Sequence, residues 1–267
     1  MTVVKVGGSI LGEGINPTII DDVVELNRRG KLVLVHGGGR KVTEIAEKLG
    51  KKQEFIVSPD GIRSRYTDSE TIEIYTMVMS GLINKEIVAA LHKVGLRALG
   101  LSGVDGGILK AERKKRLVVV DERGRKRIID GGYTGKISQV NSELLNLILN
   151  QGYLPVIAPV AIGEESELLN VDGDRAAAYV AGAIKADLII FLTDVEGIII
   201  DDKVVEKLTL EEAERLMPKI GFGMKTKVLA SIEALKMGVE RAVICSGKSD
   251  HPLLSAIDGK SGTMITK

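Results

Sequence analysis

The sequence predicts an α/β fold in which a mainly parallel sheet carries helices on both of its faces. Short apolar runs rich in Val, Ile and Leu alternate with amphipathic segments along the chain. Most of these runs are apolar enough to be covered on both faces, which is typical of strands in a parallel sheet. The alternation itself indicates repeated strand, helix, strand units. The expected strands are TVVKV, KLVLV, RALGL, YLPVIA, DLIIFL and RAVIC.

The connection between the first two strands has the signals of a helix. Asn16 and Pro17 suit the N-cap and the first helical position, an apolar stripe runs from Ile19 to Leu26, and Gly30 closes the segment. Further helices are expected over residues 40–49, 68–93, 141–150, 173–184, 210–216, 225–237 and 251–257.

Composition excludes several classes of protein. The chain has 267 residues, of which 44% are hydrophobic, so it has enough apolar side chains to bury a large core. Its 37 Lys and Arg balance 36 Asp and Glu, so no global field favours nucleic acid. Cys245 is the only cysteine, which excludes an intrachain disulfide and a multi-cysteine zinc cluster. The N-terminus has no basic segment followed by a long apolar run, and apolar runs stay far below the roughly 20 residues of a membrane span, so we expect a cytoplasmic protein with no membrane contact.

One segment breaks the α/β pattern. Residues 110–137 read as a β-hairpin with its turn near DERG, and nine of the residues from Lys110 to Arg127 are basic. Two interpretations remain open. The charges either solvate the hairpin and protect a sheet edge, or form a docking patch for an acidic partner.

Glycine-bearing turns follow five of the expected strands. They include Gly7 and Gly8, the run HGGG at 36–39, and TDVEG at 193–197, with further turns near Gly103 and Gly247. Ligands of open α/β sheets bind at the carboxyl ends of the strands, where glycine lets the backbone approach a phosphate closely. Any one of these turns is explained as a tight connection, but five along one chain favour a phosphate-binding edge.

Familiar nucleotide fingerprints are absent from the sequence. A P-loop ending at CSGKS requires Gly where Ala242 stands, and one ending at GKS 259–261 requires Gly where Leu254 stands. GFGMKT has Thr226 in the last position of a dinucleotide-binding motif. A Walker ATPase and a Rossmann dehydrogenase are therefore both unsupported.

Phosphoryl transfer requires cations that neutralise the transferred group, and Lys5, Lys225 and Lys227 are candidates. In NVDGDRAA, Asp172 or Asp174 is either a helix N-cap or, for Asp174, a counter-charge that orients two lysines.

Arg63 or Arg65 in RSRYTDSE suits bidentate binding of a carboxylate, and Thr67 or Asp68 suits the cap of the next helix. The three histidines lack metal-ligand spacing, and we expect His36 to be structural.

Six motifs, taken together and in this order, resemble the amino acid kinase family, and within it the acetylglutamate kinase branch. They are KVGGS at 5–9, VHGGG at 35–39, RYTD at 65–68, NVDGD at 170–174, TDVEG at 193–197 and GMKTKV at 223–228. The resemblance covers essentially the whole chain. It implies a three-layer αβα sandwich, one continuous domain whose N-terminal lobe (1–169, with the basic hairpin 110–129) binds the acyl substrate. The C-terminal lobe (170–267) is implied to bind ATP and Mg²⁺, and the reaction to be transfer of the γ-phosphoryl group to a side-chain carboxylate.

The same resemblance implies roles for individual residues. Lys5 and Lys227 are similar to the lysines that stabilise the transition state, and Asp174 to the carboxylate that organises them. For the substrate, the implied contacts are Gly8, Gly38, Gly39, Arg65 on the α-carboxylate with Tyr66 beside it, and Asn170. For the nucleotide they are Thr193, Asp194, Gly197, Gly221, Gly223 and Lys225. No metal-ligating side chain is implied, so Mg²⁺ is expected to be held through the nucleotide phosphates.

Two departures from the acetylglutamate kinase pattern resemble carrier-dependent relatives in lysine and arginine biosynthesis. GIRSRYTD stands where that branch has G-L-R-V-T, and the basic hairpin is additional. These relatives phosphorylate α-aminoadipate or glutamate whose α-amino group is attached to LysW, a small acidic carrier protein. The implied docking rim is formed by Lys114, Lys115, Arg116, Arg125, Lys126 and Arg127.

Two alternatives stay open: an ordinary acetylglutamate kinase, and a non-catalytic module that binds an amino acid or a nucleotide. The resemblance also implies a homodimer formed through the N-terminal lobe. Arginine-inhibited relatives carry an extra N-terminal helix, so we expect no inhibition by arginine.

Overall fold

The computed structural model describes residues 1–8, 16–221 and 223–267. Within them, the core is an eight-stranded sheet in the order β16-β18-β17-β13-β1-β2-β10-β5. The antiparallel pair β17 and β18 is the exception among otherwise parallel neighbours. All six predicted strands lie in this sheet, so the predicted fold class is confirmed. The bounds are β1 (Thr2–Val6), β2 (Leu32–His36), β5 (Ala98–Ser102), β10 (Leu154–Ala158), β13 (Leu188–Thr193), β16 (Lys207–Thr209), β17 (Arg241–Ser246) and β18 (Thr263–Thr266).

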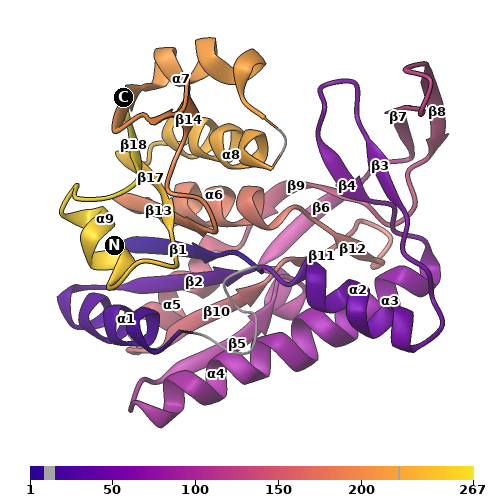
Figure 1. The fold of residues 1–267 in the computed structure, drawn as a ribbon. Coiled ribbons are helices and arrows are strands. Elements are labelled where there is room, and N and C mark those ends of the chain that lie inside the picture. Colours follow the sequence, from indigo (N-terminus) through magenta and orange to yellow (C-terminus); the bar gives the residue numbers. More distant parts are fainter. Residues whose placement is uncertain (9–15, 222) are drawn as a thin grey trace.

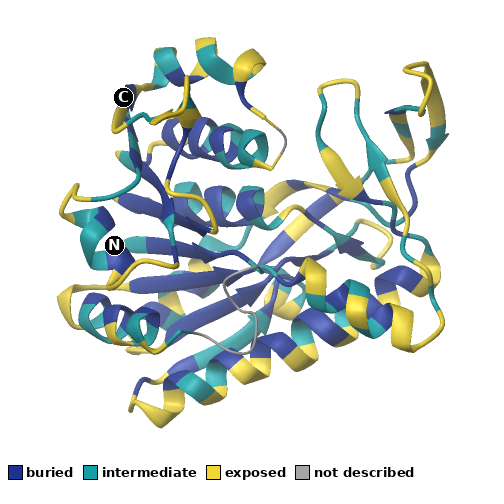
Figure 2. Ribbon diagram, viewed as in Figure 1, coloured by how far each residue is buried: buried dark blue, intermediate teal, exposed yellow. Residues whose placement is uncertain are grey.

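Helices cover both faces of the sheet, which gives three layers (Figure 1). One face is packed by α5 (Ser142–Asn150), α6 (Gly173–Ala183), α7 (Leu210–Leu216) and α8 (Met224–Lys236). The other is packed by α1 (Pro17–Arg29), α2 (Gly39–Lys48), α3 (Ser69–Thr76), α4 (Asn84–Lys93) and α9 (Pro252–Ile257). Successive strand residues point to opposite faces, so Val3 packs on the first side and Val4 on the second. The central strands β1, β2, β10 and β13 are accordingly mostly dark blue in Figure 2.

The expected helices are all present, within two residues of their predicted ends. Asn16 accepts a hydrogen bond from the Thr18 N–H at 3.0 Å and so caps α1 as predicted. Asp68 caps α3 through the Thr71 N–H at 2.8 Å, and Asp172 caps α6 through the Arg175 N–H at 2.9 Å. Asp172 is therefore the N-cap of its motif, and Asp174 lies inside the first turn of α6.

The segment predicted as one helix over 68–93 contains a change of helix type. Between α3 and α4, the residues of η1 (Met77–Ile83) form a π-helix. By length and composition the continuous helix Ser69–Lys93 is apolar enough to cross a membrane. Here its apolar side packs on the sheet, and the fully buried Asn84 donates to the carbonyl of Val156 at 2.9 Å. It is thus a core helix of this fold.

A second sheet extends one side of the molecule, in the order β12-β11-β6-β9. Its strands are β6 (Leu109–Arg113), β9 (Gly135–Val140), β11 (Val160–Ile162) and β12 (Leu168–Asn170). The predicted hairpin projects from it as β7 (Arg116–Val120) and β8 (Lys126–Asp130), closed by a hydrogen bond from the Asp121 N–H to the Arg125 carbonyl at 2.9 Å. A second hairpin, β3 (Phe55–Val57) with β4 (Arg63–Arg65), rises beside it (Figure 1). The predicted 110–137 hairpin is therefore confirmed, with β6 and β9 pairing at its base.

Candidate active site

The floor of the site is formed by backbone at the carboxyl ends of β1 and β2. A Cβ atom at Gly8 would lie 2.8 Å from the Gly38 nitrogen, and one at Gly38 would lie 2.1 Å from Cδ1 of Ile83 in η1. The two turns and the π-helix therefore approach one another more closely than side chains at these positions allow. This leaves main-chain groups facing the cavity above. Ser9, the last residue of the KVGGS motif, lies outside the described residues.

Asp174 brings the two predicted lysines together. Its Oδ1 lies 2.7 Å from Lys5 Nζ, and its Oδ2 lies 3.2 Å from Lys227 Nζ. Lys5 is on the face of β1 that α6 covers, Asp174 is in the first turn of α6, and Lys227 is in the first turn of α8. Lys5 is only 7% exposed and Asp174 only 4%, so each charge needs the other. Three elements distant in sequence thus converge on one carboxylate.

The charge state of this carboxylate follows from its neighbours. Burial by itself would raise the pKa of Asp174, but the ammonium groups of Lys5 and Lys227 outweigh it and hold the pKa at about 2. Asp174 is therefore ionised at neutral pH. Asp172 is exposed and lines the cavity. The pKa of its carboxyl is raised, first because surrounding protein groups reduce its solvation and second because the Asp174 carboxylate lies nearby.

An ion pair that sequence reasoning missed holds α6 against α8. Arg175 Nε lies 2.9 Å from Glu233 Oε2, and Nη2 lies 2.6 Å from Oε1, which is a bidentate geometry. Arg175 directly follows Asp174, and Glu233 follows Lys227 on α8. The partners are 58 residues apart, so no local pattern signals the pair.

A cavity of about 530 Å³ lies above the glycine floor on the side of the second sheet. Predicted residues that line it are Lys5, Gly8, Gly38, Gly39, Arg65, Asn170 and Asp174. The structure therefore brings most of the predicted substrate residues to one space. Tyr66 is not among the lining residues because its ring lies toward Gly132, on the opposite side of the chain from the Arg65 side chain.

Arg65 is buried at the edge of this cavity. Its Nη2 donates to the Gly39 carbonyl at 2.7 Å and to Thr43 Oγ1 at 3.0 Å, and Nη1 donates to Gln53. These acceptors are neutral, and burial together with nearby Arg63 lowers the pKa of the guanidinium. A buried cation with neutral partners is suited to receive a carboxylate. Opposite it, Asn170 Nδ2 donates to Thr67 Oγ1 at 3.0 Å, which fixes the amide at the cavity wall.

His36 is held in the neutral form beneath the site. Burial, with smaller contributions from Lys5 and Lys85, lowers its pKa to about 4. Its Nδ1 lies 3.1 Å from the Gly37 carbonyl and its Nε2 lies 3.2 Å from Asn84 Nδ2, so Nδ1 donates and Nε2 accepts. These contacts support the expected structural role.

A second cavity, of about 430 Å³, lies on the other side of Lys227. The predicted nucleotide residues that line it are Thr193, Asp194, Gly197, Gly221 and Gly223. Gly223 precedes α8 without a side-chain cap, and the Lys225 N–H donates to the Gly221 carbonyl at 3.2 Å. Both glycines line the cavity, so the positive end of the α8 dipole lies beside it and favours an anion there. Apolar walls from Ile198, Ile199 and Met224 suit a base or ribose, and the residues present therefore fit a nucleotide. In the described part of the chain, no group of three or more His, Cys, Asp or Glu side chains is placed to hold a metal ion.

Lys225 does not line the second cavity. Its Nζ instead donates to the backbone carbonyl of Asp60 at 2.8 Å, in the turn between β3 and β4. The residue thus connects the start of α8 to the hairpin beside the first cavity, a contact between segments 165 residues apart.

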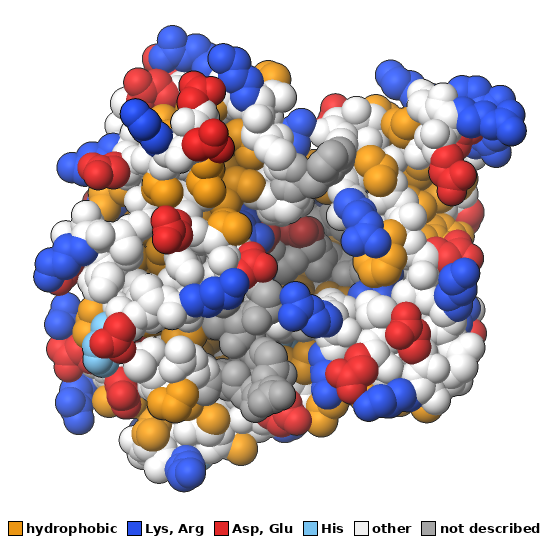
Figure 3. Space-filling view, viewed as in Figure 1, with side chains coloured by type: hydrophobic (Ala, Val, Ile, Leu, Met, Phe, Trp, Pro, Cys, Tyr) orange, Lys and Arg blue, Asp and Glu red, His pale blue; other side chains and the backbone are white. Residues whose placement is uncertain are grey.

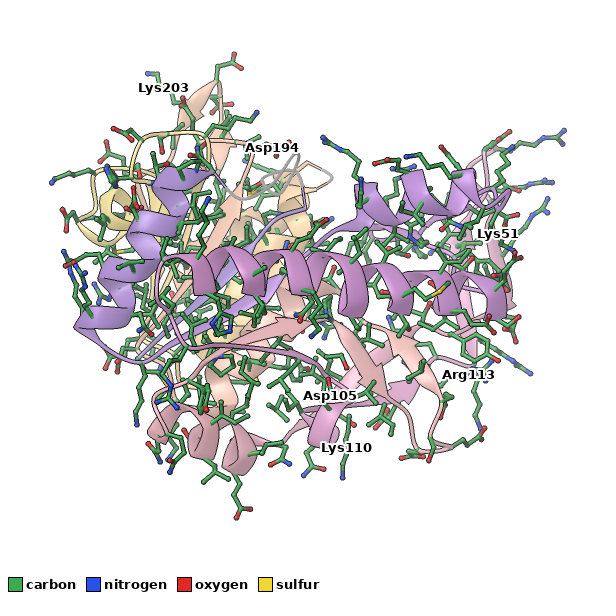
Figure 4. All side chains as sticks on the ribbon, turned by 90° about the horizontal axis from the view of Figure 1, so that it is seen from below. Lys51, Asp105, Lys110, Arg113, Asp194 and Lys203 are labelled. Carbon is green, nitrogen blue, oxygen red and sulfur yellow. The ribbon has the colours of Figure 1, made fainter. Side chains whose placement is uncertain are left out.

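The six residues predicted as a docking rim divide into three groups. Lys115, Arg116 and Lys126 are exposed on β7 and β8 or beside them. Arg125 and Arg127 are exposed and both pair with Asp121 in the turn, at 3.0 and 2.9 Å. Lys114 is different, because it lines the 530 Å³ cavity. Figure 3 shows Lys and Arg side chains gathered at the outer end of this hairpin. Lys110 and Arg113, at its base, lie on the side of the molecule opposite Asp194 (Figure 4).

Comparison with known proteins shows which family has this sequence and fold. The family model described as "Amino acid kinase family" matches residues 1–246. The chain belongs to the amino acid kinase family. As a member of it, the chain is a phosphotransferase, and a kinase of this family uses ATP. A protein of Saccharolobus islandicus named LysW-aminoadipate/LysW-glutamate kinase is 47% identical over 99% of both chains. A protein of Nitrosopumilus maritimus, provisionally given the same name, is 54% identical over 99% of both.

Solved structures share the amino acid kinase fold. N-acetylglutamate synthase from Neisseria gonorrhoeae superposes with a TM-score of 0.81 at 24% identity, covering all of this chain and 59% of the synthase chain. Carbamate kinase from Giardia lamblia bound to AMP-PNP superposes with a TM-score of 0.68 at 17% identity, covering 98% of that kinase.

Proposed function

We propose that this amino acid kinase transfers the γ-phosphoryl group of ATP to the side-chain carboxylate of α-aminoadipate carried on LysW, and also to LysW-linked glutamate. The observation that carries the proposal is the buried set of Lys5, Asp174 and Lys227, in which Lys5 lines one cavity and Lys227 the other. Two cations on opposite sides of one carboxylate suit a phosphoryl group that passes between the cavities. The full-length similarity to kinases named for this substrate supports the choice of acceptor.

The chemistry needs no general base. A side-chain carboxylate has an ordinary pKa near ~4 and is already a nucleophile at neutral pH. One of its oxygens attacks the γ-phosphorus, an oxygen–phosphorus bond forms, and the bond from the γ-phosphorus to the bridging oxygen breaks, with its electron pair leaving on ADP. Lys5 and Lys227 neutralise the charge on the transferred group, and Asp174 holds both ammonium groups in place. Mg²⁺ accompanies the nucleotide phosphates.

The substrate side is assigned from the cavity walls. Arg65 holds the α-carboxylate, Asn170 contacts the amide-bearing end, and the N–H groups of Gly8, Gly38 and Gly39 face the oxygens of the reacting groups. The exposed cations of the β7–β8 hairpin, Lys115, Arg116 and Lys126, face solvent beside the cavity and attract the acidic carrier.

The product is an acyl phosphate of lysine biosynthesis, and of arginine biosynthesis when glutamate is carried. We further propose that the protein works in the cytoplasm as a homodimer formed through the N-terminal lobe. Exposed apolar side chains on the long helix, Met77 and Leu82, support an interface there, since burying them against a second copy removes apolar surface from water.

The test is to supply purified protein with ATP, Mg²⁺ and one of three acceptors: LysW-linked aminoadipate, LysW-linked glutamate or free N-acetylglutamate. Acyl phosphate is trapped and measured as the hydroxamate. We expect turnover of the carrier-linked acceptors. Turnover of N-acetylglutamate alone would overturn the proposal in favour of an ordinary acetylglutamate kinase. Nucleotide binding without any turnover would favour a non-catalytic module instead, although such a module has no need for two lysines on one carboxylate.

A further inference from the structure

Lys114 stands apart from the other basic residues of its segment because the fold fixes its backbone. It lies between the end of β6 and the start of β7. Its N–H donates to the Thr134 carbonyl at 2.9 Å, and the Gly131 N–H donates to the next carbonyl, that of Lys115, at 3.1 Å. A Cβ atom at Gly131 would lie 1.4 Å from the Lys114 carbonyl oxygen, so the return strand approaches with no side chain between. Residues 114–115 and 131–134 are therefore hydrogen-bonded together at the point where the Lys114 side chain lines the cavity.

Positive side chains outnumber negative ones around the 530 Å³ cavity: Lys5, Arg63, Arg65, Lys114 and Arg175 line it, together with Asp60, Asp172 and Asp174. Among its lining cations, Lys5 is paired with Asp174 and Arg175 with Glu233. Arg65 and Lys114 also line it, and in the described part of the chain neither has an acidic side chain within 4.0 Å. Arg63 is exposed to water and needs no counter-charge. Two partly or fully buried cations are thus available to anionic groups of a ligand.

The surroundings of Lys114 make a bound anion favourable. Burial and the nearby positive charge of Arg175 lower the pKa of the Lys114 ammonium, and the negative charge of Asp172 offsets this only in part. Thr134, which also lines the cavity, has a buried hydroxyl without a hydrogen-bond partner among the described residues. A donor and a hydroxyl at one wall form a site that accepts an oxyanion.

We propose that Lys114 binds a second carboxylate of the substrate, located on the acyl side of the amide that carries the amino acid, while Arg65 binds the α-carboxylate. The inference rests on the proposed function, in which the amino group is acylated by a carrier. It assigns Lys114 to substrate specificity and removes it from the outer docking surface, where Lys115 and Arg116 remain. An acyl group without a carboxylate, such as acetyl, leaves this ammonium uncompensated in the cavity wall.

The test uses two small ligands that need no carrier protein: α-aminoadipate capped on its amino group by acetyl, and the same amino acid capped by glutaryl, whose acyl chain ends in a carboxylate. Dissociation constants are measured by isothermal titration calorimetry on the full chain with a non-hydrolysable ATP analogue. We expect the glutaryl cap to bind about tenfold more tightly than the acetyl cap, the gain of one partly exposed charge-assisted contact. Lys114→Met should reduce this ratio to about one while leaving acetyl binding unchanged, and Lys114→Arg should keep part of it.

Lys115→Met is the matched control and should retain the full preference. Equal binding of the two caps by the unmodified protein, a preference that survives Lys114→Met, or equal loss of both caps in that variant would each overturn the assignment. Failure of the proposed function appears separately, as absence of turnover with the LysW-linked acceptors.

Discussion

Arg175 on α6 binds both carboxylate oxygens of Glu233 on α8, with contacts of 2.9 and 2.6 Å. The neighbour of Arg175 is Asp174, and α8 also carries Lys227, so this pair fixes the separation that Lys227 spans to reach Asp174. We expect Glu233→Gln to lower kcat roughly 10- to 100-fold with little change in KM for ATP, because a small displacement of a catalytic group is costly. Steady-state kinetics measure this.

A charge swap separates positioning from simple stability. The double variant Arg175→Glu with Glu233→Arg should recover part of kcat. Lys236→Gln, which breaks the exposed pair of Lys236 at the end of α8 with Glu214 on α7, should leave kcat unchanged. Equal kcat in Glu233→Gln and the unmodified protein would show that the helix contact has no catalytic consequence.

Removal of Lys227 should separate chemistry from folding. We expect Lys227→Ala to reduce kcat about 100- to 1,000-fold, since one electrostatic contact to the transferring group is lost. Asp174 keeps Lys5 as its partner, so the variant should fold, which circular dichroism and thermal unfolding check. Full phosphoryl transfer by this variant would contradict the catalytic assignment.

Arg65 should act on substrate binding. Arg65→Lys loses the forked geometry toward a carboxylate, so we expect KM for the amino-acid substrate to rise roughly 10- to 100-fold while kcat changes little. Arg63→Lys is the control, because Arg63 lines the same cavity but is exposed. A fall in kcat at unchanged KM would place Arg65 in the chemical step.

The hairpin charges should act through long-range attraction. Changing Lys115, Arg116 and Lys126 to Glu should raise KM for the carrier-linked substrate at low salt and flatten its dependence on ionic strength. Reversal of Lys203 and Lys207 is the control, since Figure 4 shows Lys203 at the other end of the molecule from Arg113. Unchanged kinetics at low salt in the triple variant would return the hairpin to the role of a solvated sheet edge.

His36 should make stability depend on pH. Its folded pKa of about 4 lies below the ordinary 6.5, so the unfolded chain binds a proton that the folded chain refuses. The free energy of unfolding should therefore fall as the pH drops from 6.5 toward 4, by up to about 1.4 kcal/mol per unit. Urea unfolding at pH 7.0, 5.5 and 4.5 measures it. His36→Gln should show a shallower decline over that range, and parallel declines would exclude His36 as the cause.

Local sequence signals were enough for the sheet, the helices and their caps. Apolar runs long enough to cross a sheet, and residues such as Asn16 and Asp68 at helix starts, act on their immediate neighbours. No local signal marks the π-helical turn at Met77–Ile83, whose side chains Met79 and Ile83 lie against Gly38 of the glycine floor, far away in the sequence.

For the site, the family motifs indicated Lys5, Asp174 and Lys227, and in the structure both lysines contact the Asp174 carboxylate. Contacts between distant segments could not be predicted. Position in the chain groups Lys114 with its basic neighbours, but in the structure it lines the cavity, where Gly131 packs against its backbone. The partner of Arg175 and the contact of Lys225 with Asp60 are likewise set by tertiary packing.

The contact of Gly8 with Gly38 has a consequence for how such a kinase diversifies. With 2.8 Å between a Cβ at one residue and the nitrogen of the other, neither position accepts a side chain without separating the ends of β1 and β2, and Lys5 would move with them. Gly8 and Gly38 therefore do not tolerate replacement by a larger residue. A new acceptor substrate must be accommodated by the walls, through β4 and the turn that bears Lys114, while the apparatus that handles phosphate stays fixed beneath it.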